Sequence, residues 1–239
     1  MKEKINYLFI LFCVLAINMY SQPYNFPIRP GDEEWKQFKN SEEMYLACQI
    51  PKGLLKSMST KDLVTTCLNY PLISTLFAYD DLQTGFNALT KKFNGIQELI
   101  SRKDSGTELI NVYSKMSPNN YNSEWTDEQK GNFTFEFSYI ETFLAQKVIL
   151  STLTFAEKKY LVKLCTDKYN SKQKHISIFG THGTSISIWV IGRTLESDST
   201  QNLESYKTDF AKNFFIDKGL LVDLAIIEDI LEKGRKFTE

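Results

Sequence analysis

Apolar side chains recur every three or four residues along most of the chain, which is the spacing of one face of an α-helix. The clearest stripe is Leu82, Phe86, Leu89 and Phe93, after which Asn94-Gly95 supplies residues that tolerate a left-handed backbone and end helices. Similar stripes precede and follow it, separated by residues that favour helix starts and ends. The pattern predicts an all-α protein with about ten short-to-medium helices.

Candidate helix starts and stops divide the chain into pairs of helices. Ser59 with Asp62 resembles a capping box, and Thr154 with Glu157 matches that motif fully. Successive helical hairpins of roughly 40 residues would stack into an array of the HEAT or armadillo type. No repeating residue signature accompanies this spacing, so an irregular helical bundle is the other arrangement that the pattern allows.

Two segments are compatible with either helix or strand. Aromatic and polar residues alternate over 133–139, as in a strand, yet no Gly, Pro, Asn or Asp interrupts the chain from Phe133 to Leu150. The second segment, 176–191, has a glycine-flanked turn between two apolar runs and would suit a β-hairpin. We predict one long buried helix for the first segment. For the second we predict a loop followed by a helix from Thr184 to Leu195, with Gly192 at a close contact.

The N-terminus predicts export. Residues 1–7 carry two lysines, and an uncharged apolar run follows from Leu8 to Ile17, which is too short to span a bilayer. We therefore expect a signal peptide over residues 1–21, cleaved after Ser21, and a secreted or periplasmic protein with no integral membrane span. Residues 22–239 would form a single helical domain, and the polar loop 117–130 is the best candidate for a boundary within it.

Charge and composition exclude several classes of protein and of partner. Loss of residues 1–21 would remove two lysines and one glutamate, which moves the formal net charge from −1 to −2. A balance this close to neutral provides no basic field for nucleic acid. The 17 Phe and 12 Tyr residues are far from the composition of a disordered chain. No glycine-rich phosphate-binding loop is found, and we expect no cofactor.

Three cysteines remain after the expected cleavage: Cys48, Cys67 and Cys165. An odd number in an exported protein leaves at least one thiol free or paired with another chain. Cys48 and Cys67 lie on helices predicted to be neighbours, so a disulfide between them is geometrically feasible. The alternative is that each cysteine is a small buried apolar residue on a helix face.

Residues that carry chemistry form no recognisable catalytic or metal-binding constellation. His175 and His182 are the two histidines, and no third ligand has the spacing of a metal site. Cys165 lies on an apolar helix face, where a thiol is usually inert. Glu136, which we expect to be embedded among aromatic residues, is the acid best suited to a carboxylate-dependent hydrolase. A salt bridge from Glu136 to a neighbouring Lys or Arg is the simpler interpretation.

Two further features concern the surface. Tyr24, Phe26 and Trp125 are aromatic residues that we expect to be exposed and to form a ligand or partner surface. Ser199, within Asp198-Ser199-Thr200, resembles a site of bacterial O-glycosylation in a predicted exposed connector.

Three short stretches carry a resemblance: Trp35-Lys36-Gln37-Phe38, the segment 44–51 that begins Met44-Tyr45-Leu46, and Cys67-Leu68-Asn69-Tyr70-Pro71. They are similar to a group of uncharacterised exported proteins of Bacteroidetes-type bacteria, over residues 24–120. The resemblance implies export from a bacterium and assigns no activity. From the residues themselves we expect a non-catalytic helical protein that binds a protein partner in the envelope or outside the cell. The alternatives are a carboxylate-dependent hydrolase and a glycan- or small-ligand-binding protein.

Overall fold

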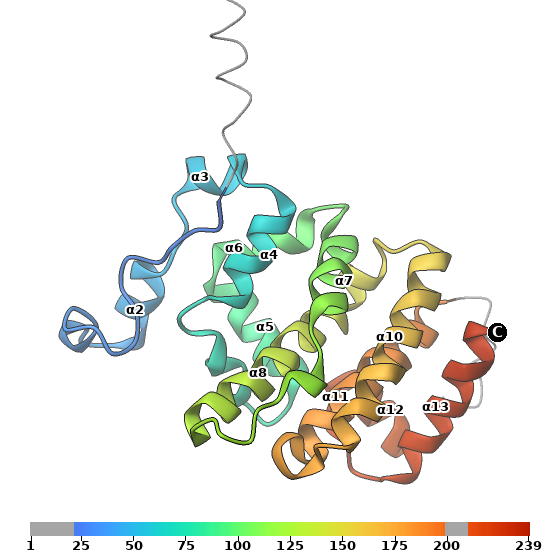
Figure 1. The fold of residues 1–239 in the computed structure, drawn as a ribbon. Coiled ribbons are helices and arrows are strands. Elements are labelled where there is room, and N and C mark those ends of the chain that lie inside the picture. The colour runs from blue at the N-terminus through green and yellow to red at the C-terminus, as the bar shows by residue number, and fades with distance from the viewer. Residues whose placement is uncertain (1–21, 199–209) are drawn as a thin grey trace, which may run out of the picture.

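The structure is a computed structural model that describes residues 22–198 and 210–239. Every regular element in these two ranges is a helix, which confirms the all-α prediction. Figure 1 shows the helices joined by short connections, with the N-terminal helices at one end of the molecule and the C-terminal helices at the other. The finer choice between a helical array and an irregular bundle stays a prediction.

The first half of the chain forms short helices. In order they are η1 (Trp35–Gln37), α2 (Ser41–Ala47), α3 (Lys52–Ser57), α4 (Thr60–Leu68), η2 (Ile73–Ala78), α5 (Leu82–Lys92), α6 (Asn94–Ser101) and α7 (Ser105–Lys115). The predicted cap at Ser59 is present, since its side chain accepts a hydrogen bond from the Asp62 amide at 3.1 Å. Ahead of them, the proline-rich arm 22–30 lies against α4, where the Tyr24 amide donates to the Thr66 hydroxyl at 2.9 Å.

The second half contains longer helices. They are η3 (Pro118–Asn120), α8 (Asp127–Leu144), α9 (Lys147–Leu150), α10 (Phe155–Gln173), α11 (Ile176–Glu196), α12 (Phe210–Lys218) and α13 (Ala225–Thr238). The capping box of Thr154 and Glu157 at the start of α10 is confirmed.

The segment 133–139 is helical, but the predicted helix boundaries are wrong. α8 begins six residues before Phe133, because Thr126 and Gln129 form a capping box that we did not identify. It ends at Leu144, so that the short helix α9 is separate from it.

The predicted helix from Thr184 to Leu195 is confirmed, and no strand forms in the described ranges. The loop predicted before Thr184 is wrong, because α11 already begins at Ile176. Gly180 has a φ of 61° and kinks α11, which is a backbone conformation that glycine adopts without strain. Beyond the kink, every residue from Gly183 to Leu195 is buried. A Cβ atom on Gly192 would collide with the side chain of Ile216, so the predicted close contact is confirmed.

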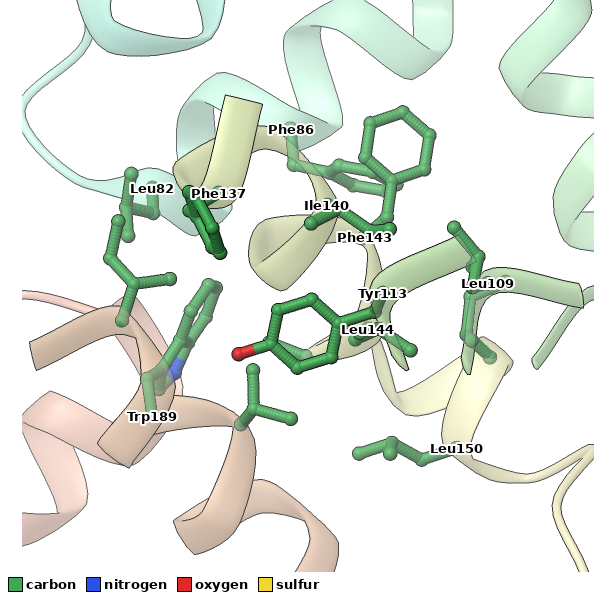
Figure 2. Packing of buried hydrophobic residues seen from close by; sticks show 14 of the residues in the cluster. Leu82, Phe86, Leu109, Tyr113, Phe137, Ile140, Phe143, Leu144, Leu150 and Trp189 are labelled. Atoms are coloured by element: carbon green, nitrogen blue, oxygen red, sulfur yellow. The ribbon is translucent and has the colours of Figure 1, made fainter. Parts of the chain in front are cut away.

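Helix α11 contacts α8, α10, α12 and α13 and is buried over most of its length. Figure 2 shows how the core forms where α5, α7, α8 and α11 converge, with Phe86, Tyr113, Phe143 and Trp189 among the buried side chains. A helix buried on all sides is typically apolar all round, and α11 follows this rule apart from a few hydroxyl groups and Arg193. The hydroxyls of Thr184, Ser185 and Thr194 donate to carbonyl groups of their own helix, which offsets the cost of burying them.

None of the helices within residues 22–198 and 210–239 combines the length and the apolar character that crossing a membrane requires. The predicted signal peptide, residues 1–21, lies outside the described residues.

Candidate functional site

Glu136 lies at the surface, on a groove between three helices. The lining comes from α4 (Thr65, Leu68 and Asn69), α7 (Val112 and Met116) and α8 (Glu136 and Tyr139), and the groove encloses about 240 Å³. These helices lie side by side (Figure 1). The expectation that Glu136 would be embedded among aromatic side chains of a buried helix is therefore wrong. The first half of α8 buries only one side, and Glu136 is on the other.

The groove combines apolar walls with one acidic group. Leu68, Val112 and Met116 supply the apolar surface, while Thr65 and Asn69 add short polar side chains. Within the part of the chain that the structure describes, Glu136 is the one acid in the lining and forms no ion pair. Partial burial raises the pKa of its carboxyl above the ordinary value, because the ionised form loses contact with water.

Aromatic rings flank the same edge of α8. Phe77 and Tyr139 stack with their ring centroids 5.5 Å apart, and Phe135 stacks on Tyr139 at 6.1 Å. Phe135 also tilts against Phe77 at 5.3 Å and is 44% exposed. The Glu136 carboxylate thus stands on the same helix as a cluster of three rings, part of which is open to solvent.

The acid that is buried is Glu141, five residues along the same helix. Lys172 of α10 donates to both of its carboxylate oxygens, at 2.6 and 2.7 Å. The hydroxyls of Tyr113 on α7 and Ser187 on α11 donate to one of these oxygens, at 2.5 and 2.8 Å. Lys172 also donates to the Gly183 carbonyl at 2.9 Å. Four helices therefore meet at one buried ion pair. The salt bridge that we expected for Glu136 does not form among the described residues, and Glu141 is the acid of α8 that pairs with a lysine.

Apolar surroundings shift the pKa values of the groups that contact Glu141. Burial lowers the pKa of Lys172, an effect that the negative charge of Glu141 opposes. Burial and the same carboxylate raise the pKa of Tyr113 well above its ordinary value. Figure 2 shows the Tyr113 hydroxyl directed into the apolar core. No described cavity reaches these groups, and the hydrogen bonds of Glu141 are taken up inside the protein. This arrangement suits helix packing better than chemistry on a substrate.

A signal for this cluster was present in the sequence, but we did not use it. Along α10, Leu161, Cys165, Lys168 and Lys172 follow each other at spacings of four, three and four residues, which is the spacing of an apolar stripe. The two lysines thus occupy core positions. Lys168 donates to the Met116 carbonyl at the end of α7, and Lys172 reaches Glu141.

The histidines do not come together as a pair. His175 packs on Tyr121, with ring centroids 5.5 Å apart, whereas His182 packs edge-on against Phe77 at 6.1 Å. Burial and the nearby charge of Lys172 lower the pKa of His182. Among residues 22–198 and 210–239, no group of three or more His, Cys, Asp or Glu residues could hold a metal ion.

The disulfide considered between Cys48 and Cys67 does not form. Cys48, Cys67 and Cys165 are all free, buried thiols, which corresponds to the alternative interpretation. Burial raises the pKa of Cys48 to about 11, and burial together with the Glu141 charge raises that of Cys165 well above its ordinary value. A thiol held in its neutral form is a poor nucleophile.

The three aromatic residues predicted for a binding surface do not form one surface, since half-buried Tyr24 packs on Phe26 and Trp125 packs on other residues. Phe26 is buried, contrary to expectation, because the arm inserts it between Tyr24, Tyr70 and Phe93. Trp125 is half-buried and packs against Phe133 near the start of α8. The candidate glycosylation residue Ser199 lies outside the described residues.

Comparison of the chain with protein-family models, with curated proteins and with solved structures finds no match. The assignment of a function therefore depends on the groove and on the charges around it.

Proposed function

We propose that this is an exported, non-catalytic helical protein that binds a partner protein through the groove between α4, α7 and α8. Export is inferred from the N-terminal pattern. The observation that carries the proposal is the Glu136 carboxylate, which lacks a cationic partner among the described residues and borders an apolar groove. A carboxylate at the edge of an apolar groove can form a charge-assisted hydrogen bond with a bound cation.

The surroundings of Glu136 indicate the chemistry of the partner. The groove walls would accept one apolar side chain, and the carboxylate would pair with a lysine or arginine beside it. The rings of Phe77, Phe135 and Tyr139 favour the same charge, because aromatic faces attract cations. A segment that carries an apolar residue next to a basic one therefore fits best.

The hydrolase alternative is less well supported. Glycoside hydrolysis uses two carboxyl groups about 5–9.5 Å apart, and the groove lining contains one. Glu141, the buried acid of the same helix, is enclosed by its bonds to Lys172, Tyr113 and Ser187. The glycan-binding alternative required an exposed Phe26 in the ligand surface, but Phe26 is buried.

Selection of displayed peptides on the immobilised protein tests the proposal. We expect enrichment of peptides that have Lys or Arg next to a large apolar residue. The enrichment should disappear with Glu136→Gln and persist with Glu128→Gln, which changes an exposed acid on the same helix. Equal enrichment on both variants, or no enrichment on the unmodified protein, would contradict the proposal.

A further inference from the structure

A second cavity lies apart from the groove, between α5, α6, α9, α11 and α12, and measures about 600 Å³. Its lining includes three basic groups, Arg193, Lys147 and Lys218, and one acid, Asp217. Arg193 is 3% exposed, whereas both lysines are partly open to solvent. The lining itself therefore has more basic than acidic groups, with Arg193 at the buried end, while the acids Glu196 and Asp81 contact the two lysines from outside it.

Arg193 has no carboxylate partner among the described residues. Its N–H groups donate to the backbone carbonyls of Ala145, Ile216 and Asp217, at 2.7 to 3.0 Å, and to the side-chain oxygen of Gln83. These bonds all go to neutral acceptors. The carboxylates of Glu196, Asp217 and Asp81 favour the charged form of the guanidinium, but none of the described residues forms an ion pair with it. The lining contains three basic groups and one acid, so the cavity beside Arg193 is suited to an anion. The lowered pKa of Arg193, at about 10, agrees with the loss of solvation.

The amide side chains around the cavity present donors rather than acceptors. The Gln83 amide nitrogen donates to the side-chain oxygens of Asn87 and Gln146, at 2.8 and 3.0 Å. The Gln83 oxygen is itself engaged by Arg193. All three amide oxygens are thus occupied, while the Asn87 amide nitrogen is available to an acceptor. The lysines have acidic neighbours: Lys147 lies 3.1 Å from Glu196 and 3.8 Å from Asp217, and Lys218 lies 3.7 Å from Asp81.

The two ends of the cavity differ in character. Gln83, Phe86, Asn87 and Thr90 lie on one face of α5, and this face is about 10 Å long at 1.5 Å per residue. Gln83 marks the end near Arg193, whereas Thr90 lies toward α6, where Ile100 lines the cavity. An elongated ligand would place a charged group at the Gln83 end and apolar atoms toward Ile100.

We infer that this cavity binds a small organic anion, with its carboxylate or phosphoryl group at the Arg193 end and an apolar portion along α5. This site is independent of the partner-binding groove, because the two linings share no residue. A carboxylate and a phosphoryl group offer the same acceptor chemistry, and experiment separates them.

Titration of the full mature protein with sodium hexanoate, inorganic phosphate and neutral 1-hexanol at constant ionic strength tests the inference. The indole N–H of Trp189 is a local probe, since it donates to the Ile216 carbonyl at 2.8 Å and its ring lies 4.4 Å from the Arg193 guanidinium. We expect saturable shifts of its ¹H–¹⁵N signal with hexanoate and none with hexanol. Competition by phosphate would identify the phosphoryl group as an equally good ligand, and lack of competition would identify the carboxylate.

The matched variants are Lys147→Gln/Lys218→Gln and, as a control, Lys52→Gln/Lys61→Gln, which changes two exposed lysines outside the cavity. All four lysines are at least partly exposed, so both variants should fold. We expect hexanoate affinity to fall about tenfold in the first variant and to stay unchanged in the control. Equal affinity in both variants, or no saturable response to either anion, would overturn the inference.

Discussion

The ammonium group of Lys172 lies 2.6 and 2.7 Å from the two carboxylate oxygens of Glu141, and both side chains are fully buried. Loss of one partner would leave the other charge buried and uncompensated. We therefore expect Lys172→Met to lower the free energy of unfolding by about 3–5 kcal/mol, measured by urea denaturation. A loss below about 1 kcal/mol, which is typical of surface pairs, would show that the pair does not stabilise the core.

Replacement of both partners gives the matched comparison. Glu141→Met/Lys172→Met removes both charges, so we expect a smaller loss than the sum of the two single losses. Some loss should persist, because the hydroxyls of Tyr113 and Ser187 would lack their acceptor. Additive losses would indicate that the two residues act independently.

The close packing of α5 on η2 predicts that any side chain at Gly85 destabilises the protein. A Cβ atom there would collide with the backbone carbonyl of Leu76, which cannot move aside as a flexible side chain can. We expect Gly85→Ala to destabilise the protein by about 1–3 kcal/mol in thermal or urea unfolding. Gly53→Ala is the control, since a Cβ atom in α3 meets nothing within 4 Å and should stabilise by about 0.5–1 kcal/mol. Similar effects at both positions would refute the packing argument.

Burial of the thiols predicts their reactivity. Cys48, Cys67 and Cys165 are buried, and burial raises the pKa of each. We expect iodoacetamide at pH 8 to leave the folded mature protein unlabelled and to modify all three thiols after unfolding, as measured by intact mass. Rapid labelling of the folded protein, or a mass two hydrogens lower under oxidising conditions, would contradict this.

The raised pKa of Glu136 predicts that its replacement stabilises the protein at neutral pH. A carboxyl whose pKa is higher in the folded state contributes stability at low pH and loses it as the pH rises through that pKa. Glu136→Gln should therefore raise the melting temperature at pH 7, and the difference should shrink near pH 4. Glu128→Gln serves as the control, because it changes an acid on the same helix that lies outside the groove. A destabilised Glu136→Gln protein at pH 7 would argue against an unpaired carboxylate in the groove.

Regular helix signals made much of the fold predictable. The stripe from Leu82 to Phe93 gave α5 within one residue, and the Thr154–Glu157 box located the start of α10. The orientation of α8 was harder to predict, because apolar residues surround most of it. Glu136 and Glu141 are five residues apart, which separates them by about 140° around a helix. Local pattern alone could not decide which of them faces the core.

The features that we did not predict from the sequence depend on contacts between segments that are distant along the chain. The candidate groove depends on how α4, α7 and α8 approach each other, and none of their sequences specifies that approach. A single charged residue within an apolar run is the best sequence signal for a buried polar site. Lys172 on the stripe of α10 and Arg193 within the apolar run of α11 both mark interior polar sites.

Arg193 connects parts of the chain that are remote in sequence, since its bond to Gln83 spans 110 positions and its other bonds reach α8 and α12. A long loop must close before this contact forms, so it adds to contact order and slows folding. Neither half of the chain can complete the α11 core alone. Unfolding should consequently be a single cooperative event, and cleavage in a connecting loop should leave no stable fragment.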